Sequence, residues 1–114
     1  MAVSTIKAMT GRKRSEMIDF TPTNGNTYQD GCFYGYVNGN VFVSVRLSGL
    51  TANSRVAVFQ LPSGYRPPVQ INVTGHGGTS ISNKCYGVIN SDGNISVNSE
   101  DEYAFFQAYF PIGS

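Results

Sequence analysis

The side chains that commonly carry out catalysis are few in this sequence, which has one histidine, two cysteines and seven acidic residues. The histidine, His76, lies in the run Gly75-His76-Gly77-Gly78, whose glycines hold a side chain poorly. A Ser-His-Asp arrangement needs a carboxylate to orient the base, and no Gly-x-Ser-x-Gly nucleophile motif is present. No helical pattern follows the glycines to complete a phosphate site. We interpret His76 as a polar loop residue without a catalytic role.

Metal sites and paired carboxylates have equally weak signals. Cys32 and Cys85 are distant from each other and from the histidine, which does not match the ligand spacing of a zinc site. The one acidic cluster, Glu100-Asp101-Glu102, falls in a predicted turn, and nothing marks a glycosidase-like pair such as Asp30 with Asp92. The sequence therefore favours a protein that is not an enzyme and that needs no metal or cofactor.

Tyrosine and amide side chains suit binding better than turnover. A tyrosine ring can cover the apolar face of a pyranose while amides and carboxylates bond its hydroxyls. The candidate saccharide-binding residues are Tyr86, Asn90, His76 and Tyr103, which loops and outward strand positions can present. Tyr86 and Tyr103 have a second interpretation, as aromatic residues of the core or of an interface, and the sequence leaves both open.

Composition sets the limits within which these residues act. A chain of 114 residues fits a single domain, and its 13% charged residues and net charge of +1 indicate no attraction to nucleic acid or to a membrane. No apolar run reaches the roughly 20 residues of a membrane span. Residues 1–10 also lack the apolar stretch of a secretory signal. We expect synthesis in a cytoplasm and, there, two buried thiols rather than a disulfide.

The first 16 residues differ from the rest of the chain. They hold half of the eight lysines and arginines, and Gly11 interrupts any helical pattern. We expect residues 1–16 to form a flexible arm or junction and residues 17–114 to form the folded domain. The run Arg12-Lys13-Arg14 is interpreted as a solvated segment, because a nucleic-acid surface needs more basic residues on one face.

From residue 17 onward, turn signals separate short apolar runs. Strands are expected at residues 17–21, 32–37, 41–47, 56–61, 69–74, 84–90, 94–98 and 103–110. Asn38-Gly39 and Asp92-Gly93 predict tight hairpin turns, the three prolines of residues 62–68 end a strand, and residues 75–79 predict a flexible connection. Eight strands at this spacing predict an all-β, antiparallel, single domain of the β-sandwich or jelly-roll-like type.

Two of the expected strands show which face is buried. In residues 41–47 the valines and Leu47 alternate with Phe42, Ser44 and Arg46, so one face packs into a core. In residues 103–110 aromatic side chains occur on both faces. Large aromatic surfaces are rarely left in water. Either the domain covers both faces of this strand, or another copy of the chain covers one face in an oligomer.

One segment resembles a known family. Val56 to Pro67 reads Val-Ala-Val-Phe-Gln-Leu-Pro-Ser-Gly-Tyr-Arg-Pro and is similar to the strand and Leu-Pro-x-Gly-Tyr-Arg-Pro signature of bacteriophage tail and baseplate proteins. The flanking residues 37–49 and 89–97 resemble that family too, so the similarity covers roughly residues 30–112. The resemblance implies a β-sandwich head of a tail fibre or receptor-binding protein that assembles as a homotrimer. In the motif, the prolines and Gly64 shape a turn, and we expect Tyr65 and Arg66 to anchor it.

The function implied by the resemblance is recognition of host cell-surface saccharides by a virion protein made in the bacterial cytoplasm. Its partners would be two further copies of the chain, the host polysaccharide and other tail or baseplate proteins, with no nucleic acid or membrane. The chain lacks the tryptophan that receptor-binding members often place in the sugar site. The alternative is a structural tail or baseplate component that docks other virion proteins and binds no glycan. A depolymerase or esterase is a third and weaker hypothesis, because acid–base residues are few.

Overall fold

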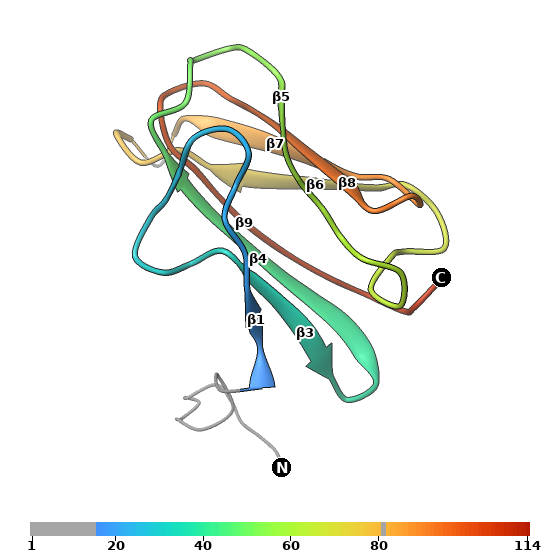
Figure 1. The fold of residues 1–114 in the computed structure, drawn as a ribbon. Helices are drawn as coiled ribbons and strands as arrows, with labels where there is room; N and C mark the ends of the chain where they lie inside the picture. The colour runs from blue at the N-terminus through green and yellow to red at the C-terminus, as the bar shows by residue number, and fades with distance from the viewer. Residues whose placement is uncertain (1–15, 81) are drawn as a thin grey trace.

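The computed structural model describes residues 16–80 and 82–114 and shows an all-β domain of antiparallel strands (Figure 1). Its strands are β1 (Ile18–Asp19), β2 (Asn26–Thr27), β3 (Phe33–Val37), β4 (Asn40–Ser48), β5 (Val56–Gln60), β6 (Ile71–His76), β7 (Lys84–Ile89), β8 (Asn94–Ser99) and β9 (Ala104–Phe110). No described residue belongs to an α-helix. The all-β fold class expected from the sequence is therefore confirmed.

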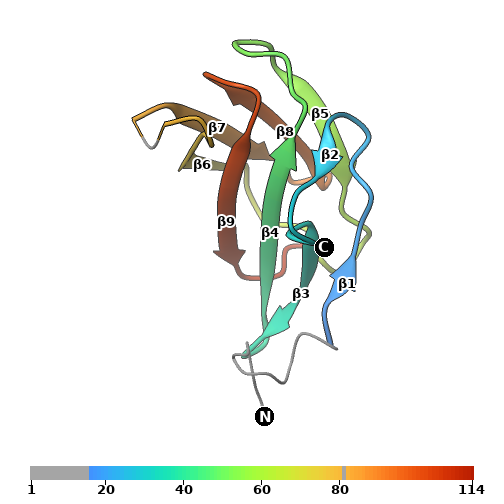
Figure 2. The same ribbon diagram turned by 90° about the vertical axis from the view of Figure 1, so that its left-hand side faces the viewer.

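The strands form one sheet that curls into two layers. Its order is β1-β3-β4-β9-β6-β7-β8-β5, and β2 adds to the edge of β4. Strands β9 and β6 share a single residue pair, His76 with Phe105, whereas β4 and β9 share seven. The sheet bends at this narrow junction. The layer of β1, β3, β4 and β9 then packs against the layer of β6, β7, β8 and β5, and the strands of the two layers cross (Figure 2).

The core lies between the two layers. The alternation expected in β4 is confirmed, because Val41, Val43, Val45 and Leu47 are fully buried. In β9 the even-numbered residues face inward and are buried, whereas the odd-numbered residues are half-buried or exposed. The opposite layer contributes fully buried side chains from the β7–β8 hairpin and β5, namely Cys85, Ile89, Ile95, Val97 and Val58.

The open edge of β5 is covered by the chain that follows β1. The Phe20 ring stacks on Phe59 with centroids 4.2 Å apart. The Thr23 amide donates a 2.7 Å hydrogen bond to the Val58 carbonyl, and the Asn24 side chain donates one of 2.7 Å to the Ala57 carbonyl. Because an uncovered strand edge invites pairing with other chains, these contacts protect β5 and join the two layers along a second seam.

The loop after β5 is fixed by the last residues of the chain. The amides of Gly64 and Arg66 donate to the Ser114 carbonyl, and the Gly113 amide donates to the Arg66 carbonyl. The Arg66 side chain also donates a 2.8 Å hydrogen bond from Nε to the carbonyl of the buried Leu61. Each backbone polar group that leaves water must find a partner, and Arg66 supplies one inside the turn.

Tyr65 anchors the same loop from its other side. Its ring stacks on Tyr36, with centroids 4.6 Å apart, and meets Tyr34 edge to face at 4.9 Å. The Tyr36 hydroxyl donates a 2.6 Å hydrogen bond to the Gly64 carbonyl. These contacts agree with the anchoring role expected for Tyr65 and Arg66.

Several expectations about individual segments need correction. Gly75 and His76 belong to β6 rather than to a flexible connection, and the two-residue strand β2 was not expected. A side chain at position 75 would overlap the Phe105 carbonyl, so glycine is what lets β9 approach β6 here. The arm expected at residues 1–16 lies almost wholly outside the described residues.

Both cysteines are buried free thiols, as expected from the sequence. Burial raises the pKa of each thiol, and hydrogen bonds to carbonyls only partly oppose this effect. Cys32 Sγ donates to the Arg46 carbonyl, and Cys85 Sγ donates to the Phe105 carbonyl. The two cysteines therefore behave as core residues rather than as nucleophiles.

The β7–β8 turn provides a test of this architecture. Gly93 has a φ of 92°, and a Cβ there would overlap the Leu61 carbonyl, whereas Gly39 has a φ of 81° and a Cβ added to it would meet nothing within 4 Å. We expect Gly39→Ala to lower the free energy of unfolding by about 1 kcal/mol through backbone strain alone. We expect Gly93→Ala to lower it by about 3 kcal/mol because overlap is added. Urea denaturation of both variants measures the difference, and equal losses would contradict the packing of the turn on Leu61.

Candidate functional site

The structure brings three of the four candidate residues onto one outer surface. His76 in β6 and Tyr86 in β7 both point away from the core, and Tyr103 joins them through Phe105. Asn90 does not join them. It lies in the turn after β7, where its backbone bonds to Asn94 and Gly93 at the end of the hairpin opposite to His76.

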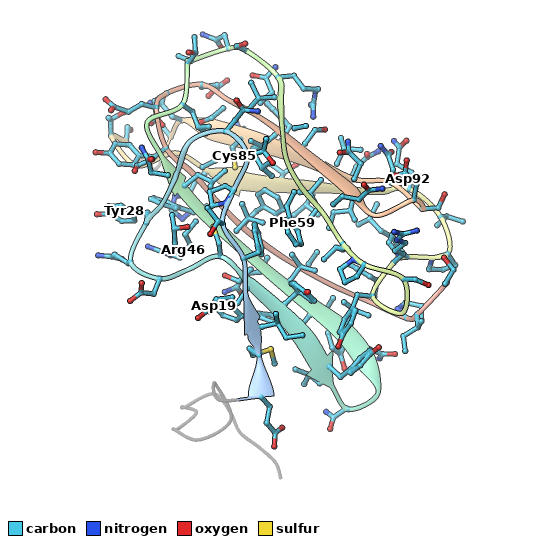
Figure 3. All side chains as sticks on the ribbon, in the orientation of Figure 1. Asp19, Tyr28, Arg46, Phe59, Cys85 and Asp92 are labelled. Atoms are coloured by element: carbon cyan, nitrogen blue, oxygen red, sulfur yellow. The ribbon has the colours of Figure 1, made fainter. Side chains whose placement is uncertain are left out.

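His76 and Tyr103 belong to a cluster of rings around one arginine, which we call the Arg46 cluster: Tyr28, Arg46, His76, Tyr103 and Phe105. The Arg46 guanidinium carbon lies 4.4 Å from the Phe105 ring centroid and 5.9 Å from that of Tyr28. The Phe105 ring is 5.3 Å from His76, 5.5 Å from Tyr28 and 6.0 Å from Tyr103. Figure 3 shows Tyr28 and Arg46 together at the edge of the molecule.

The Arg46 cluster is held in place by the loop between β2 and β3. Arg46 Nη2 donates a 3.1 Å hydrogen bond to Gln29 Oε1. Gln29 and Asp30 both have positive φ, and a side chain at Gly31 would overlap the stem of Arg46. The loop thus follows the arginine closely. The rings and the guanidinium of the Arg46 cluster stabilise one another by stacking and by cation–π contact.

Asp101 holds the other side of the Arg46 cluster. Its carboxylate accepts hydrogen bonds from the Thr79 amide and hydroxyl at 3.1 and 2.7 Å, from Asn83 Nδ2 at 3.0 Å and from the Tyr103 amide at 2.8 Å. Only 8% of Asp101 is exposed. One carboxylate therefore joins the β6–β7 loop to the turn that places Tyr103.

The protonation of Asp101 follows from these contacts. Burial raises the pKa of its carboxyl, but hydrogen bonds from Asn83, Tyr103 and Thr79 outweigh burial and hold the pKa well below its ordinary value. Asp101 is thus ionised at neutral pH. A carboxyl whose pKa is lower in the folded state than in the unfolded state stabilises the fold above its unfolded pKa, and this contribution is lost as the pH falls.

Tyr86 has a different environment from the Arg46 cluster. Its neighbours in register are Thr74 in β6 and Asn98 in β8, and all three side chains point outward in a row across the three strands. The Tyr86 side chain is 42% exposed. No side-chain hydrogen bond joins any member of this row, which we call the Tyr86 row, to another described residue. Donors and acceptors in the Tyr86 row are therefore open to a ligand.

The described residues offer little for catalysis. His76 Nδ1 lies 2.7 Å from the carbonyl of Gly77 and faces the Phe105 ring rather than a carboxylate. Within residues 16–80 and 82–114, no group of three His, Cys, Asp or Glu side chains could hold a metal ion. In the same part of the chain, no helix is long and apolar enough to cross a membrane.

Comparison with protein-family models, curated proteins and solved structures found no match to this chain. The resemblance of Val56–Pro67 to the phage tail signature therefore stays a prediction.

Sequence reasoning missed several residues of this surface. Thr74 and Asn98 could have been found, because the alternation of their expected strands places them outward beside Tyr86. Tyr28 and Arg46 had no such signal, since the pairing of β4 with β9 that brings them to Phe105 joins residues about 60 positions apart. Asp101 appeared only as part of an acidic turn.

Replacing Asp101 with asparagine tests the role of its carboxylate. Asp101→Asn turns an acceptor into an N–H group that faces the donors of Thr79 and Asn83, so we expect the free energy of unfolding at neutral pH to fall by about 1–3 kcal/mol. The loss relative to the wild type should shrink below about pH 4, because Asp101 itself then loses its stabilising charge.

Thermal unfolding of both proteins across acidic and neutral pH measures this effect. Glu102→Gln, at the exposed neighbouring position, is the control and should leave stability almost unchanged. A neutral-pH stability of Asp101→Asn equal to that of the wild type would show that the carboxylate does not hold the loop.

Proposed function

We propose that this chain is the receptor-binding head of a bacteriophage tail fibre or baseplate and that it recognises saccharides on the host cell surface without cleaving them. The observation that carries the proposal is the exposed ring of Tyr86 between Thr74 and Asn98, whose polar side chains bond to no other described residue. The resemblance of residues 56–67 to the phage tail signature supports the same assignment.

The chemistry of this surface suits a sugar. A pyranose has one apolar face and a rim of hydroxyls that both donate and accept hydrogen bonds, so it needs an aromatic ring flanked by short polar groups. Strands β6, β7 and β8 hold these side chains on a paired sheet, which keeps the entropy lost on binding small.

The outer face of the other layer supports assembly into a homotrimer. Phe42 and Tyr109 are directly opposite each other in β4 and β9, and Phe33 lies 6.0 Å from Phe42 between ring centroids. Tyr109 is 51% exposed and Phe42 is half-buried. Apolar surface of this kind marks interaction sites, and assembly of several heads multiplies weak sugar sites into useful avidity.

The oligomer can be tested by light scattering at micromolar concentration. We expect the wild type to have the mass of a trimer and Phe42→Ser to shift it toward the monomer, because a hydroxyl replaces the apolar ring at the contact. Tyr86→Ser, on the opposite layer, is the matched control and should keep the trimer mass. A monomeric wild type would remove the argument from avidity.

Binding to purified bacterial cell-surface polysaccharides tests the recognition of saccharides directly. The proposal expects the full chain to bind at least one such polysaccharide without releasing reducing sugar. The alternative function, a structural component that docks other virion proteins, predicts no glycan binding and loss of virion incorporation when residues 1–16 are deleted. Incorporation lost with glycan binding intact would assign docking to residues 1–16 and recognition to the head.

A further inference from the structure

We infer that the Tyr86 row binds an internal stretch of a neutral polysaccharide, which lies across strands β6, β7 and β8. This inference rests on the proposed function and names its ligand class and its binding residues. It assigns the contact to Thr74, Tyr86 and Asn98, and it excludes the Arg46 cluster, where two of the candidate residues lie.

The exclusion follows from what each aromatic residue already contacts. Tyr103 packs on Gly78, Tyr28 and Phe105, and His76 meets the edge of Phe105. The rings of the Arg46 cluster thus cover one another. Tyr86 makes no ring contact with any other described residue, so its exposed face is available for stacking.

The hydrogen-bonding groups beside Tyr86 are also available. The hydroxyl of Thr74 and the amide of Asn98 each offer a donor and an acceptor, and neither bonds to another described residue. In the next row, by contrast, Asn72 accepts from Gln70, and Ser96 accepts from Arg55. The Tyr86 row therefore differs from the next row in that none of its side chains bonds to another described residue.

The charge of the face favours a neutral ligand. The six outward positions in the middle of β6, β7 and β8 carry no charge: Asn72, Thr74, Tyr86, Val88, Ser96 and Asn98. Of the nearby cations, Arg55 bonds to Ser96 at the edge of this group rather than to the Tyr86 row. Lys84 occupies the neighbouring outward position of β7, beside Glu100, whose carboxylate accepts from the Lys84 amide. Recognition of phosphate or uronic acid relies on charge-assisted bonds from arginine or lysine, which the Tyr86 row does not provide.

The shape of the row favours the middle of a chain over its end. Adjacent strands lie about 4.8 Å apart, so the outer members of the row are about 10 Å apart. Strand β6 pairs with β9 only at His76, and β5 pairs with β8 no further along than Val97. No described strand continues the sheet beside Thr74 or Asn98. A polymer that crosses the row therefore meets no further strand at either end, and on the β8 side it meets only the segment before β5, whose Asn53 amide donates to the Ser99 carbonyl.

Calorimetric titration of the 114-residue chain tests this inference with three kinds of probe. These are neutral hexose oligomers of increasing length, polygalacturonate and poly(glycerol phosphate), and an array of bacterial surface polysaccharides extends the set. We expect binding to neutral oligomers, an affinity that rises with length to a plateau, and little change with salt, since screening affects only charged contacts.

Variants of the Tyr86 row locate the contact. Tyr86→Ala should weaken binding about tenfold or more through loss of the stacked ring, whereas Tyr86→Phe should keep most of the affinity. Thr74→Val and Asn98→Ala should each weaken binding by a few-fold.

Two control variants should bind as the wild type does. Val69→Ala shortens an exposed apolar side chain just before β6, outside both the Tyr86 row and the surface of Phe42 and Tyr109, and Lys84→Gln removes the nearby charge. Thermal unfolding confirms that each variant is folded.

Different failures have different meanings. Neutral oligomers that bind Tyr86→Ala as tightly as the wild type would overturn the assigned site and leave the proposed function standing. A salt-sensitive preference for polygalacturonate or poly(glycerol phosphate), lost in Lys84→Gln, would overturn the neutral class. Absence of binding to every oligomer and every polysaccharide of the array would overturn the proposed function and this inference with it.

Discussion

The whole arrangement depends on the single residue pair that joins β9 to β6. With only His76 and Phe105 in register, the sheet cannot continue flat and instead bends into two layers with the core between them. Gly75 makes the junction possible, because any side chain there would overlap the Phe105 carbonyl. The bend also sets His76 against the outer ring of Phe105, so the same constraint that closes the core gathers the Arg46 cluster on the outside.

A low charge content makes this junction dependent on a few polar groups. With 13% charged residues, the chain has few charged side chains with which to fix its loops. Asp101 and Arg46 fix them by hydrogen bonds and ring contacts instead, Asp101 on the β6–β7 loop and Arg46 on the loop after β2. A buried carboxylate with several donors is stable only while all of them stay in place. The two loops at this end of the sheet are therefore coupled through Tyr103, whose amide bonds Asp101 and whose ring meets Tyr28.

Local patterns in the sequence predicted the parts of the fold that depend on neighbouring residues. The alternation of Val41, Val43 and Val45 indicated the buried face of β4, and Asn38-Gly39 indicated its hairpin, with positive φ at both residues. The pairing of β4 with β9 and of β5 with β8 had no local signal, because it depends on how the two layers close around the core. The prediction that His76 lies in a flexible loop was wrong for the same reason. The glycines around it indicated flexibility, whereas Gly75 in fact allows β9 to approach β6 closely.

The candidate site illustrates the same division between local and long-range information. The sequence could predict that Tyr86 points outward from its strand. Its neighbours Thr74 and Asn98 follow from the register once the order β6–β7–β8 is known. What sequence could not decide was which aromatic residues remain unpaired after folding. The local sequence around Tyr103 and His76 favoured a ligand-binding role as much as that around Tyr86. In the folded domain, however, the bend at Phe105 places Tyr103 and His76 against other rings. Whether an outward aromatic residue of this fold stays exposed thus depends on the junction between β6 and β9 rather than on the strand that carries the residue. For this reason the ring of Tyr86, which the junction leaves without a partner among the described residues, is the one on which a ligand can stack.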